Sequence, residues 1–291
     1  MQKKFTSLGL MSGTSGDGVD ASVVISDGLT NFKALKNKFY EYDNEIYKNL
    51  HSLKYKVNNS KDLKIYIKEI QKLERKITFF HAKVTKDFNL DYNDLLVGFH
   101  GQTIYHNSKE KISCQLGNGE LLHQLTKNKV IYNFRANDIL NEGEGAPLTP
   151  IFHQQIVREK KIDTPICILN IGGISNVSII RKPENFSEII SRDIGPGNCL
   201  IDYWVRKNSN DKFDKDGRTA LLGKRNEIIF EQARDLYLNR LNKDKLSFDV
   251  NDFDISFMRG LSFEDGVTTL TDFTAEIIAE ELNHLIFDKS K

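Results

Sequence analysis

A glycine-rich loop near the start of the chain carries residue types that bind phosphate groups. Residues 12–20, SGTSGDGVD, hold three glycines, three hydroxyl side chains and two carboxylates. Glycines let the backbone approach a phosphate closely, and the hydroxyls of Thr14 and Ser15 add donors to the exposed N–H groups. Asp17 and Asp20 could hold a metal ion, as phosphate chemistry requires. Because no GK[ST] sequence follows, the loop is not a Walker A motif, and an ordinary glycine-rich hairpin explains it equally well.

Four further residues have types suited to catalysis, to anion binding or to metal binding. Asp193, in RDIGPGN, is expected just off the end of an apolar strand and beside a rigid turn, where a general base or a plain turn aspartate is equally compatible. Arg135 follows VIYNF and could bind an anionic oxygen, although an arginine there is more often a surface ion-pair partner. His100 and His106 flank GQTIY, and this spacing does not favour a metal-binding pair.

Apolar segments broken by glycine must position these residues. Residues 5–10 and 19–25 are predicted to be two strands on either side of the glycine-rich loop, which makes a β-hairpin. A second strand–glycine–strand unit, at 166–170 and 175–180, has the same outline. Two such hairpins, one in each half of the chain, indicate a duplicated architecture.

Other elements are predicted from hydrophobic spacing. A long amphipathic helix is predicted over 61–89, with Ser60 as its N-cap. Residues 141–150, NEGEGAPLTP, are the best candidate for a hinge or domain crossover, because they combine two glycines with two of the five prolines. Further strands are predicted over 94–99 and 129–134, and further helices over 121–126, 151–160, 199–207 and 267–287.

The composition excludes several classes of protein. Lys and Arg total 41 against 40 Asp and Glu, which argues against a nucleic-acid-binding protein. Three cysteines with no CxxC spacing argue against a disulfide scaffold or a cysteine-rich zinc site. No run of about 18 apolar residues is present, so no membrane span is expected. We therefore expect a cytoplasmic α/β protein with no nucleic-acid or membrane partner.

Seven sequence blocks occur in a fixed order between residues 9 and 217. Together they resemble the anhydro-N-acetylmuramic acid kinase family, which acts in peptidoglycan recycling. The blocks are GLMSGTSGDGVDA, GFHGQTIYH, the stretch from LGNGELL to IYNFRANDI, EGAPLTPIFHQ, LNIGGISN, DIGPGNCLIDYW and FDKDG.

The resemblance implies a fold and a reaction. The fold is the actin/hexokinase-type ATPase fold, α/β, with two RNase H-like domains and a central nucleotide cleft; we expect the domains at 1–135 and 136–291. The reaction opens the 1,6-anhydro ring with water and transfers the γ-phosphoryl group of ATP to O6, giving N-acetylmuramic acid 6-phosphate and ADP. ATP and Mg²⁺ are implied, the partners are small molecules, and a homodimer is possible.

The resemblance also implies a role for each matching residue. Asp193 matches the catalytic base, and Arg135 matches an arginine near the sugar site. A loop lining the cleft is matched by His100, Gln102 and Thr103, which are expected to bind substrate. The ATP phosphate-binding loop is matched by Gly13, Thr14, Ser15, Gly16, Asp17, Gly18, Val19 and Asp20, with Asp17 as the metal ligand.

The sequence departs from the family pattern in three places. Gly16 stands where members usually have a bulky apolar residue, and Asn133 stands where they usually have Asp. Members normally continue past a helix like 267–287 into a glycine-rich strand that holds adenosine, and no such strand follows here. A shortened member or a fragment is therefore expected. The alternative function is a catalytically silent sugar- or nucleotide-binding remnant, while an actin-like ATPase fits less well because DIGPGN and EGAPLTP belong to the sugar kinase pattern.

Overall fold

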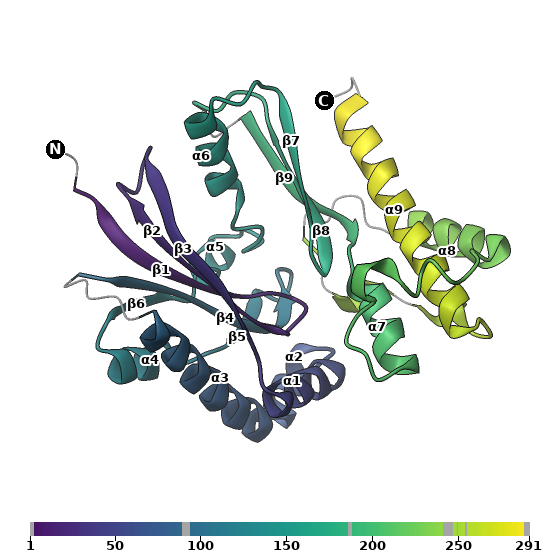
Figure 1. Ribbon diagram of the computed structural model, residues 1–291, viewed down its shortest axis with the longest axis horizontal. Helices are drawn as coiled ribbons and strands as arrows, with labels where there is room; N and C mark the ends of the chain where they lie inside the picture. Colours follow the sequence, from purple (N-terminus) through teal and green to yellow (C-terminus); the bar gives the residue numbers. More distant parts are fainter. Residues whose placement is uncertain are drawn as a thin grey trace. The chain divides into compact units, whose positions relative to one another are not determined.

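The computed structural model describes residues 3–88, 94–185, 188–240, 247–248, 250–253 and 255–287. The chain divides into two compact units, Met1–Thr164 and Pro165–Lys291, and each has its own sheet (Figure 1). The domains expected from the sequence were 1–135 and 136–291, so residues 136–164 fall in the first of these units. The class is mixed α/β.

The first unit contains a mixed sheet of six strands. Its order is β3-β2-β1-β4-β5, and β6 also pairs with β4. β1 runs parallel to β4 and antiparallel to β2, so the glycine-rich loop lies at one end of a central strand. The strands are β1 (Phe5–Ser12), β2 (Gly18–Ser26), β3 (Phe32–Glu41), β4 (Leu96–Asn107), β5 (Ile112–Leu116) and β6 (Lys129–Tyr132).

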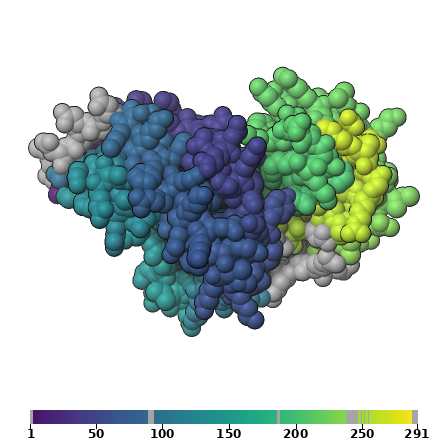
Figure 2. All heavy atoms as spheres, turned by 90° about the horizontal axis from the view of Figure 1, so that it is seen from below, coloured from purple at the N-terminus to yellow at the C-terminus, as the bar shows by residue number. Residues whose placement is uncertain are grey.

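Helices cover one face of this sheet. Figure 1 shows α1, α3 and α4 on the same side of the strands, and Figure 2, seen from below, shows the part of the chain that holds α1 and α3 at the front of the first unit, in dark blue and blue. Leu50 and Ile77 of these helices are fully buried in one cluster with Leu8, Val97 and Phe99 of the sheet. The helices of the whole unit, on this face and elsewhere, are α1 (Asn44–Lys56), α2 (Ser60–Ile65), α3 (Ile67–Asp87), α4 (Gly119–Thr126), α5 (Ala136–Leu140) and α6 (Pro150–Lys160).

The second unit packs helices beside a three-stranded antiparallel sheet. The order β7-β8-β9 follows the chain. Trp204, Met258, Leu270 and Phe273 are buried in the main apolar cluster of this unit. Its elements are β7 (Ile166–Ile171), β8 (Ile174–Ile180), β9 (Ile189–Pro196), α7 (Cys199–Asn208), α8 (Glu227–Arg240), α9 (Phe263–Phe287) and three short 3₁₀ turns at Lys215–Gly217, Val250–Asp252 and Ser256–Met258.

Both predicted hairpins are confirmed, because β1–β2 and β7–β8 are antiparallel pairs. The helix predicted over 61–89 exists as two helices that meet at Tyr66, and residue 89 lies outside the described residues. Its predicted N-cap is wrong by one residue: Asn59 accepts from the Lys61 N–H, and Asp62 accepts from the Asn59 N–H in return. Within the described ranges, no helix is long and apolar enough to cross a lipid bilayer.

Candidate active site

The loop between β1 and β2 folds into a tight turn. The Gly16 N–H donates to the Gly13 carbonyl oxygen at 3.1 Å. The Ser15 hydroxyl donates to Oδ1 of Asp17 at 2.6 Å. The turn is therefore defined by bonds within the loop itself, as well as by contacts with the elements beneath it.

The three glycines of this loop differ in how much room the protein leaves for a side chain. Gly16 has a φ of +64°, and a Cβ there would lie 2.7 Å from Cδ2 of Leu50. A Cβ at Gly18 would run into the carbonyl oxygen of Tyr40. A Cβ at Gly13, in contrast, would meet only Oγ of Ser15, at 3.9 Å. Glycine is required at 16 by the turn and at 18 by the close approach of β3, whereas a side chain at 13 would meet little of the protein, so Gly13 leaves a space open.

Two carboxylates follow this turn closely. Burial, and then the negative charge of Asp17, raises the pKa of Asp20. Two like charges so placed favour a bound cation. Among the residues that the structure describes, no group of three or more His, Cys, Asp or Glu could hold a metal ion. The pair nevertheless fits Mg²⁺, which is often held by one or two carboxylates while phosphates and waters complete its shell.

A cation reaches the loop from α1. Nζ of Lys54 donates to the carbonyl oxygen of Thr14 at 2.7 Å. Its positive charge offsets part of the negative charge that Asp17 and Asp20 bring to this region. Sequence reasoning missed Lys54, because nothing in the local pattern connects α1 with the loop.

Arg135 and His100 form a bonded pair next to the end of β6. The guanidinium donates to Nε2 of His100 from Nη2 at 2.9 Å and from Nε at 3.2 Å. Its Nη1 donates to the Gly145 carbonyl oxygen at 2.6 Å. Nδ1 of His100 lies 2.8 Å from the Gly101 carbonyl oxygen, so the ring carries its proton on Nδ1 and accepts at Nε2. Arg135 is thereby held by β4 and by the loop between α5 and α6, both in the first unit.

Burial and the adjacent Arg135 charge lower the pKa of His100 to about 4, against the weaker opposing effect of its bond to Gly101. The imidazole is therefore neutral at physiological pH. A neutral ring can accept from the arginine, whereas a protonated ring would repel it.

The other two predicted substrate-binding residues lie farther along β4. Gln102 is fully buried. Its Oε1 accepts from the Ser12 hydroxyl at 2.6 Å, and its Nε2 donates to the Gly13 carbonyl oxygen at 2.9 Å. Thr103 accepts at Oγ1 from Nε2 of Gln115 at 3.2 Å. The Gln102 amide thus makes its bonds to β1 and the loop, although the family resemblance implied that it binds substrate.

Asp193 belongs to the second unit. The expectation that it lies just off a strand end is wrong, because β9 continues to Pro196. It is 7% exposed, and Oδ2 accepts from the Phe248 N–H at 2.8 Å. The pairing of β8 with β9 shifts here, since Asn176 pairs with Asp193 but Ser175 pairs with Gly195. One extra residue, Ile194, therefore follows the carboxylate as a β-bulge, a feature that often re-aims side chains at functional sites.

Gly197 and Asn198, directly after β9, are fastened to the glycine break between β7 and β8. The Gly197 N–H donates to the Gly173 carbonyl oxygen at 3.0 Å, and the Asn198 N–H donates to the Gly172 carbonyl oxygen at 2.8 Å. A Cβ at Gly197 would run into the Gly172 carbonyl oxygen. Two sequence blocks that are separated along the chain therefore form one packed backbone cluster.

Comparison with known proteins identifies the family. A family model described as anhydro-N-acetylmuramic acid kinase matches residues 5–291. The chain belongs to this family. A relative of that name from Pelagibacter ubique is 52% identical, and the match covers 97% of this chain and 76% of the relative. Relatives of the same name from Zymomonas mobilis and Agrobacterium fabrum are 35% and 32% identical, with 95% and 96% of this chain covered and 76% of each relative.

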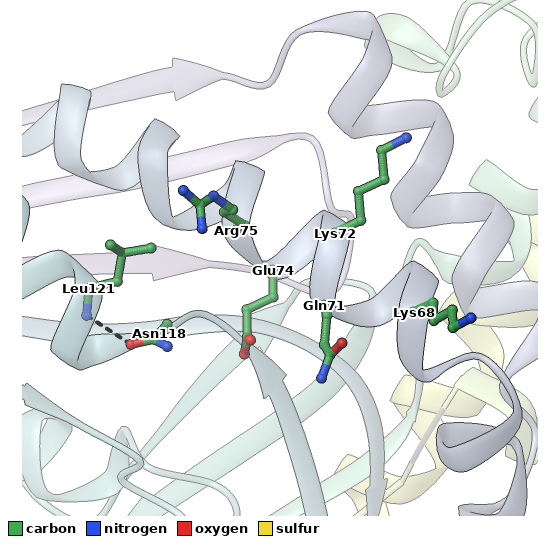
Figure 3. Close-up of a pocket in the computed structure, with 7 residues that line it drawn as sticks. All are labelled: Lys68, Gln71, Lys72, Glu74, Arg75, Asn118 and Leu121. Carbon is green, nitrogen blue, oxygen red and sulfur yellow. Dashed lines mark hydrogen bonds between the residues drawn. The ribbon is translucent and has the colours of Figure 1, made fainter.

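The first unit also has a hollow on its surface. Figure 3 shows it between α3 and the start of α4, where the charged ends of Lys68, Lys72 and Arg75 point in different directions. Such divergent cations do not converge on one ligand. None of its lining residues is a predicted site residue; they are Lys68, Gln71, Lys72, Glu74, Arg75, Asn118 and Leu121.

The buried neutral histidine predicts a pH dependence of stability. The unfolded chain protonates His100 below about pH 6.5 and the folded chain only below about pH 4, so the stabilisation by the neutral ring is lost as pH falls through this window. His100→Asn removes this titration. The difference in free energy of unfolding between wild type and variant should therefore shrink by about 2 kcal/mol between pH 7.5 and pH 4.5. Urea unfolding at both pH values measures it, and a difference that stays constant would contradict the neutral His100.

Proposed function

We propose that this chain is an ATP-dependent kinase that phosphorylates anhydro-N-acetylmuramic acid. The observation that carries the proposal is the match to the anhydro-N-acetylmuramic acid kinase family over residues 5–291, with a relative of that name 52% identical. The chain is accordingly a phosphotransferase that uses ATP and a small sugar substrate. The glycine-rich loop, the Arg135–His100 pair and Asp193 supply residue types that this chemistry needs.

Phosphate binding is assigned to the loop at residues 13–20. Phosphoryl transfer passes through a loose transition state, so it depends on positioning and charge neutralisation more than on a covalent partner. The open space at Gly13 lets phosphate oxygens approach the backbone N–H groups, which bind anions. Lys54, fixed on the Thr14 carbonyl oxygen, adds positive charge beside them.

Base chemistry is assigned to Asp193. Its carboxylate takes a proton from a water molecule, and the water oxygen forms a bond to C1 of the sugar while the C1–O6 bond breaks. O6 keeps the electron pair of that bond and forms a bond to the γ-phosphorus of ATP, and ADP leaves. One base serves both events, because ring opening itself releases the acceptor oxygen. The products are N-acetylmuramic acid 6-phosphate and ADP.

Asp17 and Asp20 would hold Mg²⁺ together with the phosphates of ATP. When bound, the ion would neutralise charge on the phosphate oxygens. The two carboxylates fit this role because a cation would offset the charge of Asp17, which adds to the effect of burial in raising the pKa of Asp20.

Sugar recognition is assigned to Arg135, His100 and Thr103. The neutral His100 ring orients the guanidinium, which can then bind the substrate carboxylate or a hydroxyl. The finer fold assignment, two RNase H-like domains of the actin/hexokinase type with a nucleotide cleft, belongs to the same proposal. So do a cytoplasmic location and a homodimer.

Removing the carboxylate charge tests the assignment of the base. Asp193→Asn keeps an oxygen that can accept from the Phe248 N–H, so the fold should remain, but the variant cannot take a proton from water. Turnover should fall by about 10²–10⁴, with the loss at the upper end. ADP release with ATP and the anhydro sugar measures it.

The matched control is Asp265→Asn in the same unit, where Oδ1 likewise accepts a backbone N–H, from Lys224 at 2.7 Å. This variant should keep full turnover. If Asp193→Asn retains more than about a tenth of the activity, Asp193 is not the base.

Filling the open space in the loop tests the phosphate site. Gly13→Val places methyl groups where the protein has room but where phosphate oxygens should come close to the backbone. ATP binding should weaken by more than about tenfold, while thermal stability changes little because no contact is strained. Calorimetric titration with ATP measures it, and Gly13→Ala should give an intermediate loss. Equal affinity for ATP in the wild type and both variants would contradict the phosphate site and favour an ordinary hairpin.

A further inference from the structure

We propose that Tyr42 is a positioning residue for the phosphate-binding loop and acts on it through Ser12 and Gln102. The proposal rests on the ATP-binding role assigned to residues 13–20 above. Tyr42 lies between β3 and α1, outside every sequence block that resembles the family, and no chemistry has been assigned to it so far.

Tyr42 contacts both ends of the loop. Its backbone N–H donates to the Asp17 carbonyl oxygen at 2.8 Å, at the end that leads into β2. Its hydroxyl lies 3.0 Å from Oγ of Ser12, the last residue of β1. The residue is 2% exposed, and its ring packs edge-on against Phe80 of α3 with 4.9 Å between centroids. The packing of the Tyr42 ring therefore fixes the position of the Tyr42 hydroxyl next to Ser12.

The direction of the bond between the hydroxyls follows from counting protons. Ser12 has a single hydroxyl proton and lies 2.8 Å from the Gly18 carbonyl oxygen and 2.6 Å from Oε1 of Gln102. Both atoms only accept, so the Ser12 proton goes to one of them. Tyr42 must then donate to Ser12. Burial also raises the pKa of Tyr42, which keeps the phenol protonated and able to donate.

The side-chain amide of Gln102 connects Ser12 with the turn. Its Nε2 donates to the Gly13 carbonyl oxygen at 2.9 Å, so its Oε1 must face Ser12. Of the two acceptors of Ser12, Oε1 of Gln102 is the nearer, at 2.6 Å against 2.8 Å for the Gly18 carbonyl oxygen. With the Ser12 proton on Gln102, the chain of donors runs from Tyr42 through Ser12 and Gln102 to Gly13. Without the Tyr42 hydroxyl, the buried Ser12 oxygen loses its donor, and Ser12 and Gln102 are free to reorient.

The consequence is a loop in which the Gly13 and Asp17 carbonyl oxygens accept from Gln102 and from Tyr42. A carbonyl oxygen that accepts from Gln102 is kept away from a phosphate that it would repel. The Gly16 N–H donates to the Gly13 carbonyl oxygen, and the other N–H groups of the turn are then left to face the ligand. Tyr42 should therefore affect ATP binding and leave the affinity for the sugar unchanged.

Removing one hydroxyl group tests this role. Tyr42→Phe keeps the ring that packs on Phe80 and should raise KM for ATP about 5-fold to 10-fold, with KM for the sugar unchanged. The matched control is Tyr40→Phe on β3, where the ring lies under Lys38 and the hydroxyl makes no bond to the loop. The control should stay within about 2-fold of wild type. An unchanged KM for ATP in Tyr42→Phe would overturn the proposal.

A double-mutant cycle separates positioning from general loss of structure. If Tyr42 acts through Ser12, Tyr42→Phe should have little further effect on KM for ATP when it is added to Ser12→Ala. Additive effects of the two substitutions would contradict the chain of donors.

Amide hydrogen exchange of residues 13–17 in the free protein tests, without any turnover, whether Tyr42 holds the loop in place. Exchange should accelerate in Tyr42→Phe and not in Tyr40→Phe. If exchange is faster in Tyr42→Phe but the wild-type protein has no kinase activity, the positioning role of Tyr42 stands and the proposed function is wrong. If exchange is unchanged in Tyr42→Phe and the wild-type protein is an active kinase, the positioning role of Tyr42 is wrong and the proposed function stands.

Discussion

The pairing of β1 with β4 carries one extra residue in β4, and the loop geometry of the first unit depends on it. Leu10 pairs with Phe99, but Ser12 pairs with Gln102, so His100 and Gly101 share one position of the ladder. Gly101 has a φ of +73°, and a Cβ there would lie 2.5 Å from the Leu116 carbonyl oxygen. The bulge brings Gln102 onto the face that Phe99 occupies, which is also the face of Ser12. A regular strand would turn the Gln102 amide away from the loop.

The second unit uses the same device at Asp193, where Ile194 is the extra residue of β9. In each unit a bulge lies beside a residue with an assigned role, and glycine follows within the strand, at Gly101 and at Gly195. Bulges re-aim side chains while the ladder on either side stays intact. A polar group can then be buried in a sheet and still meet its partners, as Gln102 does with Ser12.

The sequence indicated the residues of the glycine-rich loop better than the residues from other elements that hold this loop in place. Glycines and hydroxyls at 12–20, with apolar runs on both sides, were enough to predict the hairpin and its loop. Lys54 and Tyr42 were out of reach, because their bonds to the loop span 40 and 30 residues and leave no local pattern. β3 was missed for another reason: this edge strand is exposed along nearly its whole length, so it lacks the alternation that marks a strand. The glycines at 101 and 195 were the available signal for the bulges.

The central claim is that the chain couples ring opening to phosphoryl transfer. The most direct measurement incubates the protein with Mg²⁺, ATP and anhydro-N-acetylmuramic acid in isotopically labelled water and identifies the products by mass spectrometry. The account predicts equal amounts of ADP and N-acetylmuramic acid 6-phosphate, with an unlabelled phosphoryl group, and no ADP when the sugar is left out. ADP with labelled inorganic phosphate and no sugar phosphate would contradict it, since the chain would then be an ATPase.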